Sequence, residues 1–212
     1  MNSRISPLHL ALLFATALVF AWSGWRPYDR FTWWLEVAPG MIGLALLIFT
    51  YSSFRFTTLV YTLIALHVML LCVGGHYTYA RVPLFTWIEP FFGWHRNHFD
   101  RLGHFMQGFV PALIARELFV RLRVVPAGGW RFFIVVLICL GISGLYELLE
   151  WGAAVAGRAA SDAFLGTQGD VWDTQKDMFM ALLGAVCALV LISRWQNRQM
   201  RHLPSGSIGF ER

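Results

Sequence analysis

The sequence has few charged residues for its length. Only 14% of its 212 residues are charged, while 57% are hydrophobic; a soluble domain has roughly 25% charged and 45–50% apolar residues. This shortage argues against a soluble domain and for a protein embedded in lipid. The net charge of +5 does not indicate nucleic-acid binding, because the basic residues flank apolar runs, as membrane anchors do. The expected partner is the lipid bilayer, with no nucleic acid.

Cysteine is scarce as well, and several familiar enzyme motifs are missing. The three cysteines lie inside apolar runs without zinc or redox spacing, so we expect buried, unreactive thiols. The chain has no P-loop, no Rossmann glycine pattern, no Gly-x-Ser-x-Gly elbow and no haem-attachment motif. The sequence therefore gives no sign of a nucleotide-binding enzyme, an α/β-hydrolase or a c-type haem protein.

Long apolar runs are what the chain does have. Each covers about 18–22 residues, which is enough at 1.5 Å per residue to cross a hydrocarbon layer of about 30 Å. They predict an all-α polytopic membrane helix bundle of about six transmembrane helices. Residues 1–195 would form this single domain, and residues 196–212 a polar cytoplasmic tail without regular structure. The runs are Pro7–Gly24, Trp34–Tyr51, Thr57–Gly75, Leu102–Val120, Trp130–Trp151 and Asp173–Ser193.

The placement of charge predicts an orientation in a bacterial inner membrane. More arginines flank the runs on the side of the N-terminus, so both termini are expected in the cytoplasm. Ten of the 12 acidic residues then fall in outer loops or at outer helix ends. The two longest connections, His76–Phe99 and Gly152–Trp172, lie on that same outer side. Loops of this length are often functional.

Three of the expected helices carry pairs of ionisable residues at their outer ends. The members of each pair are three or four positions apart and therefore share a helix face. One member of each pair lies at the interface, and the other lies about one turn, or ~5–6 Å, deeper. The interfacial members are Asp100, Glu150 and Asp173, and the deeper members are His104, Glu147 and Asp177.

Three interpretations of this layer stay open. It could be a polar active or binding site without metal, because ionisable residues inside a membrane are usually functional. It could bind Zn, Mn or Fe, since one imidazole and two carboxylates suit these metals. It could also be structural, with the acids paired to Arg96, Arg101 and Lys176 and favouring the starts of helices. The metal candidates are His104, Glu147 and Asp177; the catalytic candidates add Asp100 and Asp173. The candidate substrate-binding residues are His76, His98, Arg101, Glu150, Gln168 and Asp170.

Other polar and small residues suggest structural roles. His67, in the middle of the third run, is expected to hydrogen-bond a neighbouring helix. Glu117 is expected to form an ion pair with Arg116 and Arg121 near the cytoplasmic interface. Three glycines are expected to let helices pack closely: Gly141, Gly144 and Gly184.

Four stretches carry a family resemblance. They are Arg96–His104 with Gln107–Phe109, Phe164–Gln175, His76–Tyr79, and Tyr146-Glu147 near Glu150-Trp151. These motifs resemble those of the YjdF-like family of uncharacterised bacterial inner-membrane proteins. The resemblance covers most of the chain and implies a multi-pass membrane protein, but no particular activity. Phe99 departs from the Tyr expected at that position, so a tyrosyl role there is not predicted.

A fainter similarity is to VanZ-like membrane proteins. It rests on Asp100 with His104, and on Asp173 with Asp177 ahead of the small residues 181–185. Such an analogy of motifs carries no mechanism.

Three functions fit these features. The first is a membrane enzyme or binder that acts on an envelope lipid or another amphiphile at the outer leaflet. The second is a small transporter or permease for a cation or weak base, for which His67 and Glu117 would continue the path inward. The third is a scaffold or assembly subunit.

Overall fold

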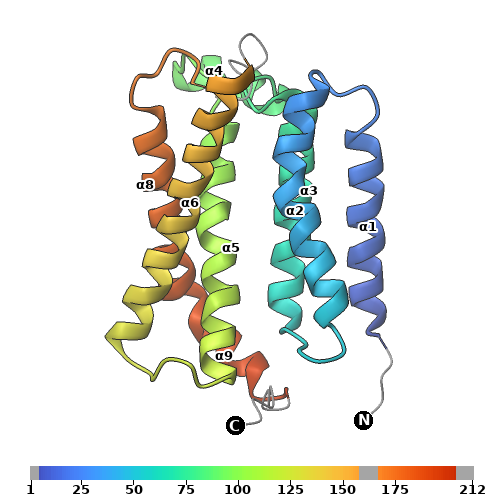
Figure 1. Ribbon diagram of the computed structural model, residues 1–212, viewed down its shortest axis with the longest axis vertical. Helices are drawn as coiled ribbons and strands as arrows, with labels where there is room; N and C mark the ends of the chain where they lie inside the picture. The colour runs from blue at the N-terminus through green and yellow to red at the C-terminus, as the bar shows by residue number, and fades with distance from the viewer. Residues whose placement is uncertain (1–4, 158–166, 204–212) are drawn as a thin grey trace.

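The computed structural model describes residues 5–157 and 167–203. Every regular element within these residues is helical (Figure 1), which confirms the prediction of an all-α membrane bundle. The elements are α1 (Pro7–Ser23), α2 (Arg30–Thr50), α3 (Thr58–Tyr77), α4 (Pro83–Phe92), α5 (Phe99–Arg121), α6 (Gly129–Gly157), α8 (Asp173–Cys187), η2 (Ala188–Ile192) and α9 (Ser193–Met200).

The six long helices run side by side, and they correspond to the six expected runs (Figure 1). Among the described residues, four stretches are long and apolar enough to cross a membrane: α2, α3, α6 and the continuous segment Asp173–Met200. Helix α1 is apolar but has only 17 residues. Helix α5 has 23 residues and carries charged residues near both ends. The beginning of α1 and helix α9 lie at the same end of the bundle (Figure 1).

Two of the expected loops contain helix. The connection after α3 includes α4, which begins at Pro83, where the fixed φ of proline suits the first helical turn. Helix α6 continues to Gly157, so the beginning of the expected loop Gly152–Trp172 is helical. Residues 158–166 of that loop lie outside the described residues.

The expected tail is also partly helical. Helix α9 extends to Met200, and the Gln196 side chain on it is fully buried, with its Nε2 donating to Leu113 O at 2.8 Å. The prediction of an unstructured tail is therefore wrong for residues 196–200, because a buried amide ties them to α5. Residues 204–212 lie outside the described residues.

Glycines bring α5 and α8 into close contact. A methyl group at Gly108 would overlap the Ala181 carbonyl oxygen, and one at Gly184 would overlap the Phe105 carbonyl oxygen. This confirms the packing role predicted for Gly184. It does not hold for Gly141, since a Cβ there would meet no atom within 4 Å.

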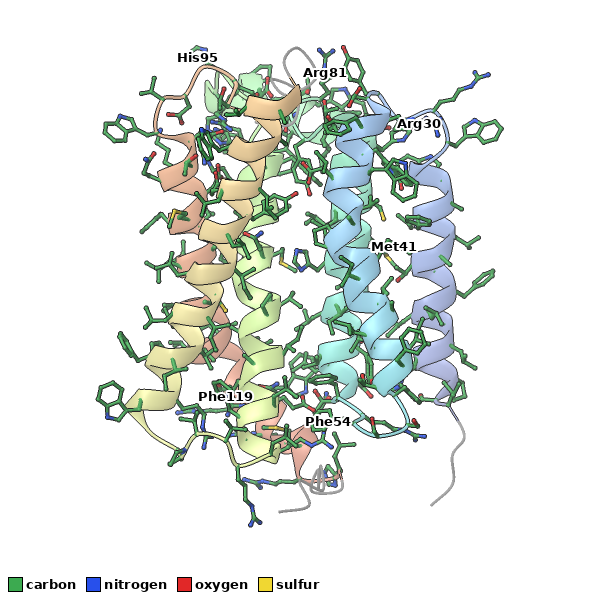
Figure 2. All side chains as sticks on the ribbon, viewed as in Figure 1. Arg30, Met41, Phe54, Arg81, His95 and Phe119 are labelled. Atoms are coloured by element: carbon green, nitrogen blue, oxygen red, sulfur yellow. The ribbon has the colours of Figure 1, made fainter. Side chains whose placement is uncertain are left out.

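A buried cluster of polar groups connects the helices at the end of the bundle near Phe54 (Figure 2). Glu117 is fully buried and accepts hydrogen bonds from the backbone N and the Oγ1 of Thr57, both at 2.8 Å. Arg121 Nη1 lies 3.0 Å from Glu117 Oε1, as predicted. Arg116 is not part of this pairing, because it donates to Gln196 Oε1 at 2.7 Å instead. With its carboxylate bonded from α3 and α5, Glu117 has a structural role.

Candidate functional site

The opposite end of the bundle, which carries His95 and Arg81 in Figure 2, contains a network of ion pairs. Arg101, in the first turn of α5, reaches across to α8. Its Nη1 donates to Asp177 Oδ1 at 2.5 Å, and its Nη2 donates to Asp173 Oδ1 at 2.6 Å. Arg96 Nη1 approaches the same Asp173 oxygen to 2.5 Å. Asp173 and Asp177 are both buried, and their charges are compensated within the protein.

Asp170 extends this network towards the surface. Its Oδ2 lies 2.7 Å from Lys176 Nζ and 3.2 Å from Arg101 Nη2. The hydrogen bonds from Lys176 and from the Trp172 backbone N–H lower the pKa of Asp170 to about 2. We name Arg96, Arg101, Asp170, Asp173, Lys176 and Asp177 the arginine network. For the aspartates of α8 and of the turn before it, this network agrees with the structural interpretation, in which the acids pair with basic residues.

Gln168 connects the two segments that lead into α5 and α8. Its Oε1 accepts from Asn97 N at 2.9 Å and its Nε2 donates to Asn97 O at 3.0 Å. The Asn97 side chain is buried in turn, and its Nδ2 donates to Val82 O at 3.0 Å. Gln168, predicted to bind substrate, thus has its amide occupied by backbone groups.

A second cluster lies one turn deeper on α5. His104 Nε2 is 3.5 Å from Glu147 Oε1 and 3.6 Å from Asp100 Oδ1. One ligand atom each from His104, Glu147 and Glu150 lie within 4.8 Å of one another, and the same holds for Asp100, His104 and Asp177. We name His104, Asp100, Glu147 and Glu150 the histidine cluster. The structure therefore brings His104 close to both Glu147 and Asp177, but the guanidinium of Arg101 engages Asp177.

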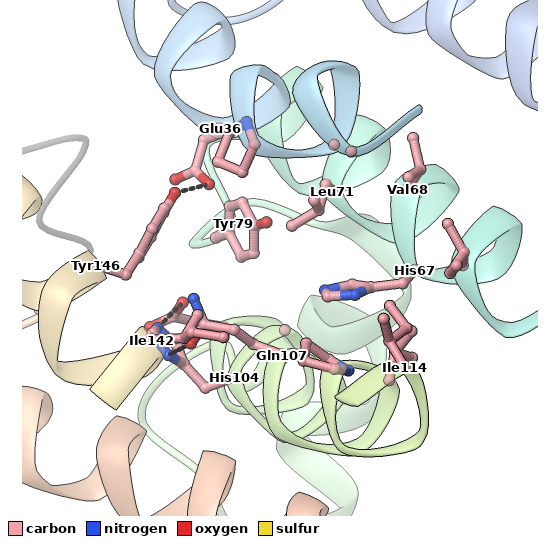
Figure 3. Close-up of a pocket in the computed structure, with 18 of the residues that line it drawn as sticks. Glu36, His67, Val68, Leu71, Tyr79, His104, Gln107, Ile114, Ile142 and Tyr146 are labelled. Carbon is pink, nitrogen blue, oxygen red and sulfur yellow. Dashed lines mark hydrogen bonds and ion pairs between the residues drawn. The ribbon is translucent and has the colours of Figure 1, made fainter. Parts of the chain in front are cut away.

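Three members of the histidine cluster, Asp100, His104 and Glu150, line a cavity of about 280 Å³ between α2 and α3 on one side and α5 and α6 on the other (Figure 3). Glu36 enters it from α2, where its Oε2 accepts from the Tyr146 hydroxyl at 2.8 Å. The polar lining consists of Glu36, His67, Tyr79, Asp100, His104, Gln107, Tyr146 and Glu150. The remaining lining is apolar or glycine: Pro39, Gly40, Gly43, Ile64, Val68, Leu71, Gly103, Val110, Pro111, Ile114 and Ile142.

Of the six predicted substrate-binding residues, only Glu150 lines this cavity; Arg101, Gln168 and Asp170 have the partners given above, and the two histidines also lie elsewhere. His76 is stacked on Trp22 and its Nδ1 lies 2.9 Å from Ser23 O, so it joins α3 to the end of α1. His98 precedes α5 and packs edge-on against Trp94. Burial and the nearby Arg96 guanidinium lower the pKa of His98. Neither histidine lines the cavity.

Glu36 lines the cavity although it is not among the residues predicted from the sequence, where a signal for it is nevertheless present. Glu36 is the one charged residue in the expected run Trp34–Tyr51, and an acid inside an apolar helix usually faces the protein interior. The prediction for His67 was wrong in a different way. Among the described residues its Nε2 has no hydrogen-bond partner, and it is buried and faces the cavity instead of a neighbouring helix (Figure 3).

Comparison with known proteins places these residues in a family context. The family described as "Predicted membrane protein (DUF2238)" matches residues 8–198. The chain is 46% identical over 202 residues to the inner membrane protein YjdF of Escherichia coli (strain K12), covering 95% of this chain and 97% of that protein. These matches confirm the YjdF-like resemblance and give no support to the VanZ-like one. No solved structure matches the chain.

Proposed function

The chain belongs to the DUF2238 family of predicted membrane proteins, and from this premise we propose that it is an inner-membrane protein that binds an amphiphile in the cavity. The headgroup would lie at the histidine cluster and the tail along the apolar wall. With both termini in the cytoplasm, the histidine cluster would open near the outer leaflet, so an envelope lipid is the expected ligand. The observation that carries the proposal is the polarity gradient along the cavity.

This gradient appears on each helix that lines the cavity with charged groups. Along α5, the lining changes from Asp100 and His104 to Val110 and Ile114, over about 21 Å at the helical rise of 1.5 Å per residue. Helix α6 runs the other way and changes from Glu150 to Ile142. A molecule with one polar and one apolar end matches this lining better than a fully polar solute does.

The proposal places the entry to the cavity on the side of α2 and α6. Gly43 on α2 and Ile142 on α6 both line it. Ile142 is 40% exposed, and a Cβ at Gly43 would meet no atom within 4 Å. Neither observation shows a close neighbour covering the lining at these positions, and we propose that a lipid tail enters the cavity beside these two residues.

The polar end holds groups that could also act on a bound headgroup. Imidazole and carboxyl side chains perform most general acid–base catalysis, and His104 and Glu150 both line the cavity. The transporter alternative is less well supported. Its path would need Glu117, whose carboxylate is fully buried and bonded to Thr57 and Arg121.

The test compares two glycine-to-leucine variants. Gly43→Leu would place a side chain in the cavity entrance, whereas Gly141→Leu adds the same side chain at a helical glycine outside the cavity lining. Both substitutions remove a glycine from a helix, so helix propensity changes equally. Lipid retained through purification would be measured by mass spectrometry, and rebinding by titration of a fluorescent phospholipid in detergent.

We expect Gly43→Leu to weaken lipid binding roughly tenfold or more, a loss of at least about 1.4 kcal/mol. Gly141→Leu should bind as the unmodified protein does. Equal lipid binding by both variants would refute the cavity as the binding site.

A further inference from the structure

The charges of the arginine network balance without the histidine cluster. Its three basic residues, Arg96, Arg101 and Lys176, stand against three aspartates, Asp170, Asp173 and Asp177. Arg96 Nη2 also forms one longer ion pair with the histidine cluster, at 3.9 Å from Asp100 Oδ2. The shorter ion pairs of these described basic residues are all to Asp170, Asp173 and Asp177.

The histidine cluster contains a buried oxygen without a partner. Glu147 is 7% exposed, and its Oε1 has no hydrogen-bond partner among the described residues. This oxygen faces His104 Nε2 at 3.5 Å, a separation too long for a hydrogen bond with good geometry. A carboxylate oxygen and an imidazole nitrogen that face each other in a buried site leave room for a positive species between them.

We propose that a divalent cation binds between His104 Nε2, Glu147 and Glu150. A tetrahedral ion with bonds of about 2.1 Å holds its ligand atoms about 3.4 Å apart. The 3.5 Å between His104 Nε2 and Glu147 Oε1 matches that spacing, and Glu150 lies within 4.8 Å of both. Modest side-chain rotation of Glu150 completes a one-imidazole, two-carboxylate set that suits Zn²⁺ or Mn²⁺.

Gln107 orients the imidazole for this role. His104 Nδ1 lies 3.1 Å from Gln107 Oε1. When Nδ1 donates its proton to this amide oxygen, the lone pair of Nε2 faces Glu147. Such a hydrogen bond on the remote nitrogen is the usual support of a metal-bound histidine. Asp100 Oδ1 lies 3.6 Å from the same Nε2 and can supply a further ligand.

This ligand set differs from the one expected from sequence, which contained Asp177. Arg101 donates to Asp177 Oδ1 at 2.5 Å, so a cation there would compete with a guanidinium. Glu150 has no such pairing with a basic residue among the described residues, and it lines the cavity. Because the proposed ligand set contains Glu150 in place of Asp177, the cation would lie nearer to the cavity than the sequence alone suggests.

The cation would determine which headgroup the cavity accepts. This step rests on the proposed amphiphile binding. Without a cation, the carboxyl groups of Glu36, Asp100 and Glu150 offer no positive charge to an anionic headgroup and repel it when ionised. An ion held by His104 with an open coordination position towards the cavity reverses that preference and would bind a phosphate oxygen. The ligand class is therefore an amphiphile with a phosphate headgroup.

The first experiment uses the metals alone. The full-length protein in detergent would be stripped with a chelator and titrated with Zn²⁺ and with Mn²⁺, with bound metal measured by elemental analysis. His104→Ala and Glu147→Gln should each lose binding by roughly 100-fold, and Gln107→Ala by about 10-fold. Glu36→Gln is the matched control, a buried carboxyl in the same cavity outside the ligand set, and should bind normally.

Thermal unfolding would establish that each variant is folded before titration. Failure of the unmodified protein to bind either metal, or unchanged binding by folded Glu147→Gln, would overturn the cation site. If His104→Ala does not fold, the result for Glu147→Gln decides, because this change keeps the side-chain volume.

The second experiment separates the cation site from the proposed function. A phospholipid with an exposed phosphate would be titrated with and without chelator, beside a neutral lipid of the same chain length. Chelation should weaken the phosphate lipid roughly tenfold or more and leave the neutral one unchanged. Metal binding should persist in Gly43→Leu. If the unmodified protein binds metal but no lipid, the result would count against the amphiphile cavity alone, and lipid binding that is indifferent to chelation would overturn the cation's role in headgroup choice.

Discussion

Arg101 Nη1 donates to Asp177 Oδ1 at 2.5 Å, and this ion pair joins the first turn of α5 to the second turn of α8. One turn further along α5, His104 faces Glu147 on α6 at 3.5 Å. These two contacts show that the acidic residues at this end of the bundle have two different kinds of partner. Asp177 is neutralised by a guanidinium, whereas Glu147 meets an imidazole across a gap. The first contact holds helices together, and the second defines the candidate site.

Removal of the guanidinium should be costly. Arg101→Gln leaves Asp177 buried without its guanidinium partner, while Asp173 keeps Arg96, and the loss of one partner from a buried pair costs about 3–5 kcal/mol. Thermal unfolding in detergent should show a large fall in Tm. Lys176→Gln is the matched control, since the Lys176 side chain is 53% exposed and such surface pairs contribute about 0–1 kcal/mol. Similar Tm values for the two variants would contradict the buried network.

The contact between α5 and α8 should not tolerate a larger residue. Gly184→Ala would drive a methyl group into the Phe105 carbonyl oxygen, and overpacking of this kind costs about 1–3 kcal/mol. Gly141→Ala should instead stabilise its helix by up to about 1 kcal/mol, because it meets no neighbour and alanine favours helix. The Tm values of the two variants should move in opposite directions. A fall of similar size in both would exclude this difference in packing.

Acid should weaken the outer part of the arginine network in a defined range. The pKa of Asp170 is lowered to about 2 by the hydrogen bonds from Lys176 and the Trp172 N–H, from about 3.9 in an unfolded chain. A lowered carboxyl pKa gives stability that is present above the unfolded value and disappears as the pH falls through the folded value.

Comparison with Asp170→Asn tests this. The difference in stability between the unmodified protein and the variant should be constant above about pH 4 and vanish towards pH 2. A difference that persists unchanged at pH 2 would mean that the Asp170 charge is not its source.

The orientation can be tested with reporter fusions. The excess of arginines at the end of the bundle that holds α9 predicts both termini in the cytoplasm. A reporter active only in the periplasm should give no signal after Arg212 and a strong signal after Gly157, at the other end of α6. The reverse pattern would turn the histidine cluster towards the cytoplasmic leaflet and exclude an outer-leaflet ligand.

The sequence by itself determined the class of protein and the depth of each ionisable group along its own helix. Apolar runs such as Thr57–Gly75 are long enough to span a bilayer, and this property depends only on local composition. Helical periodicity likewise places His104 one turn below Asp100, and Glu147 one turn from Glu150, whatever their neighbours are. The depth of each group along its own helix axis could therefore be predicted.

Tertiary structure alone decided which groups meet. The distance from Arg101 to Asp177, or from His104 to Glu147, depends on how closely and at what rotation two helices pack. Between α5 and α8 that packing is set by contacts such as Gly108 with Ala181. Periodicity within one helix contains no information about the rotation of the next. For the same reason Glu36, on a helix remote in sequence, could be recognised as part of the cavity only after α2 had been placed opposite α5 and α6.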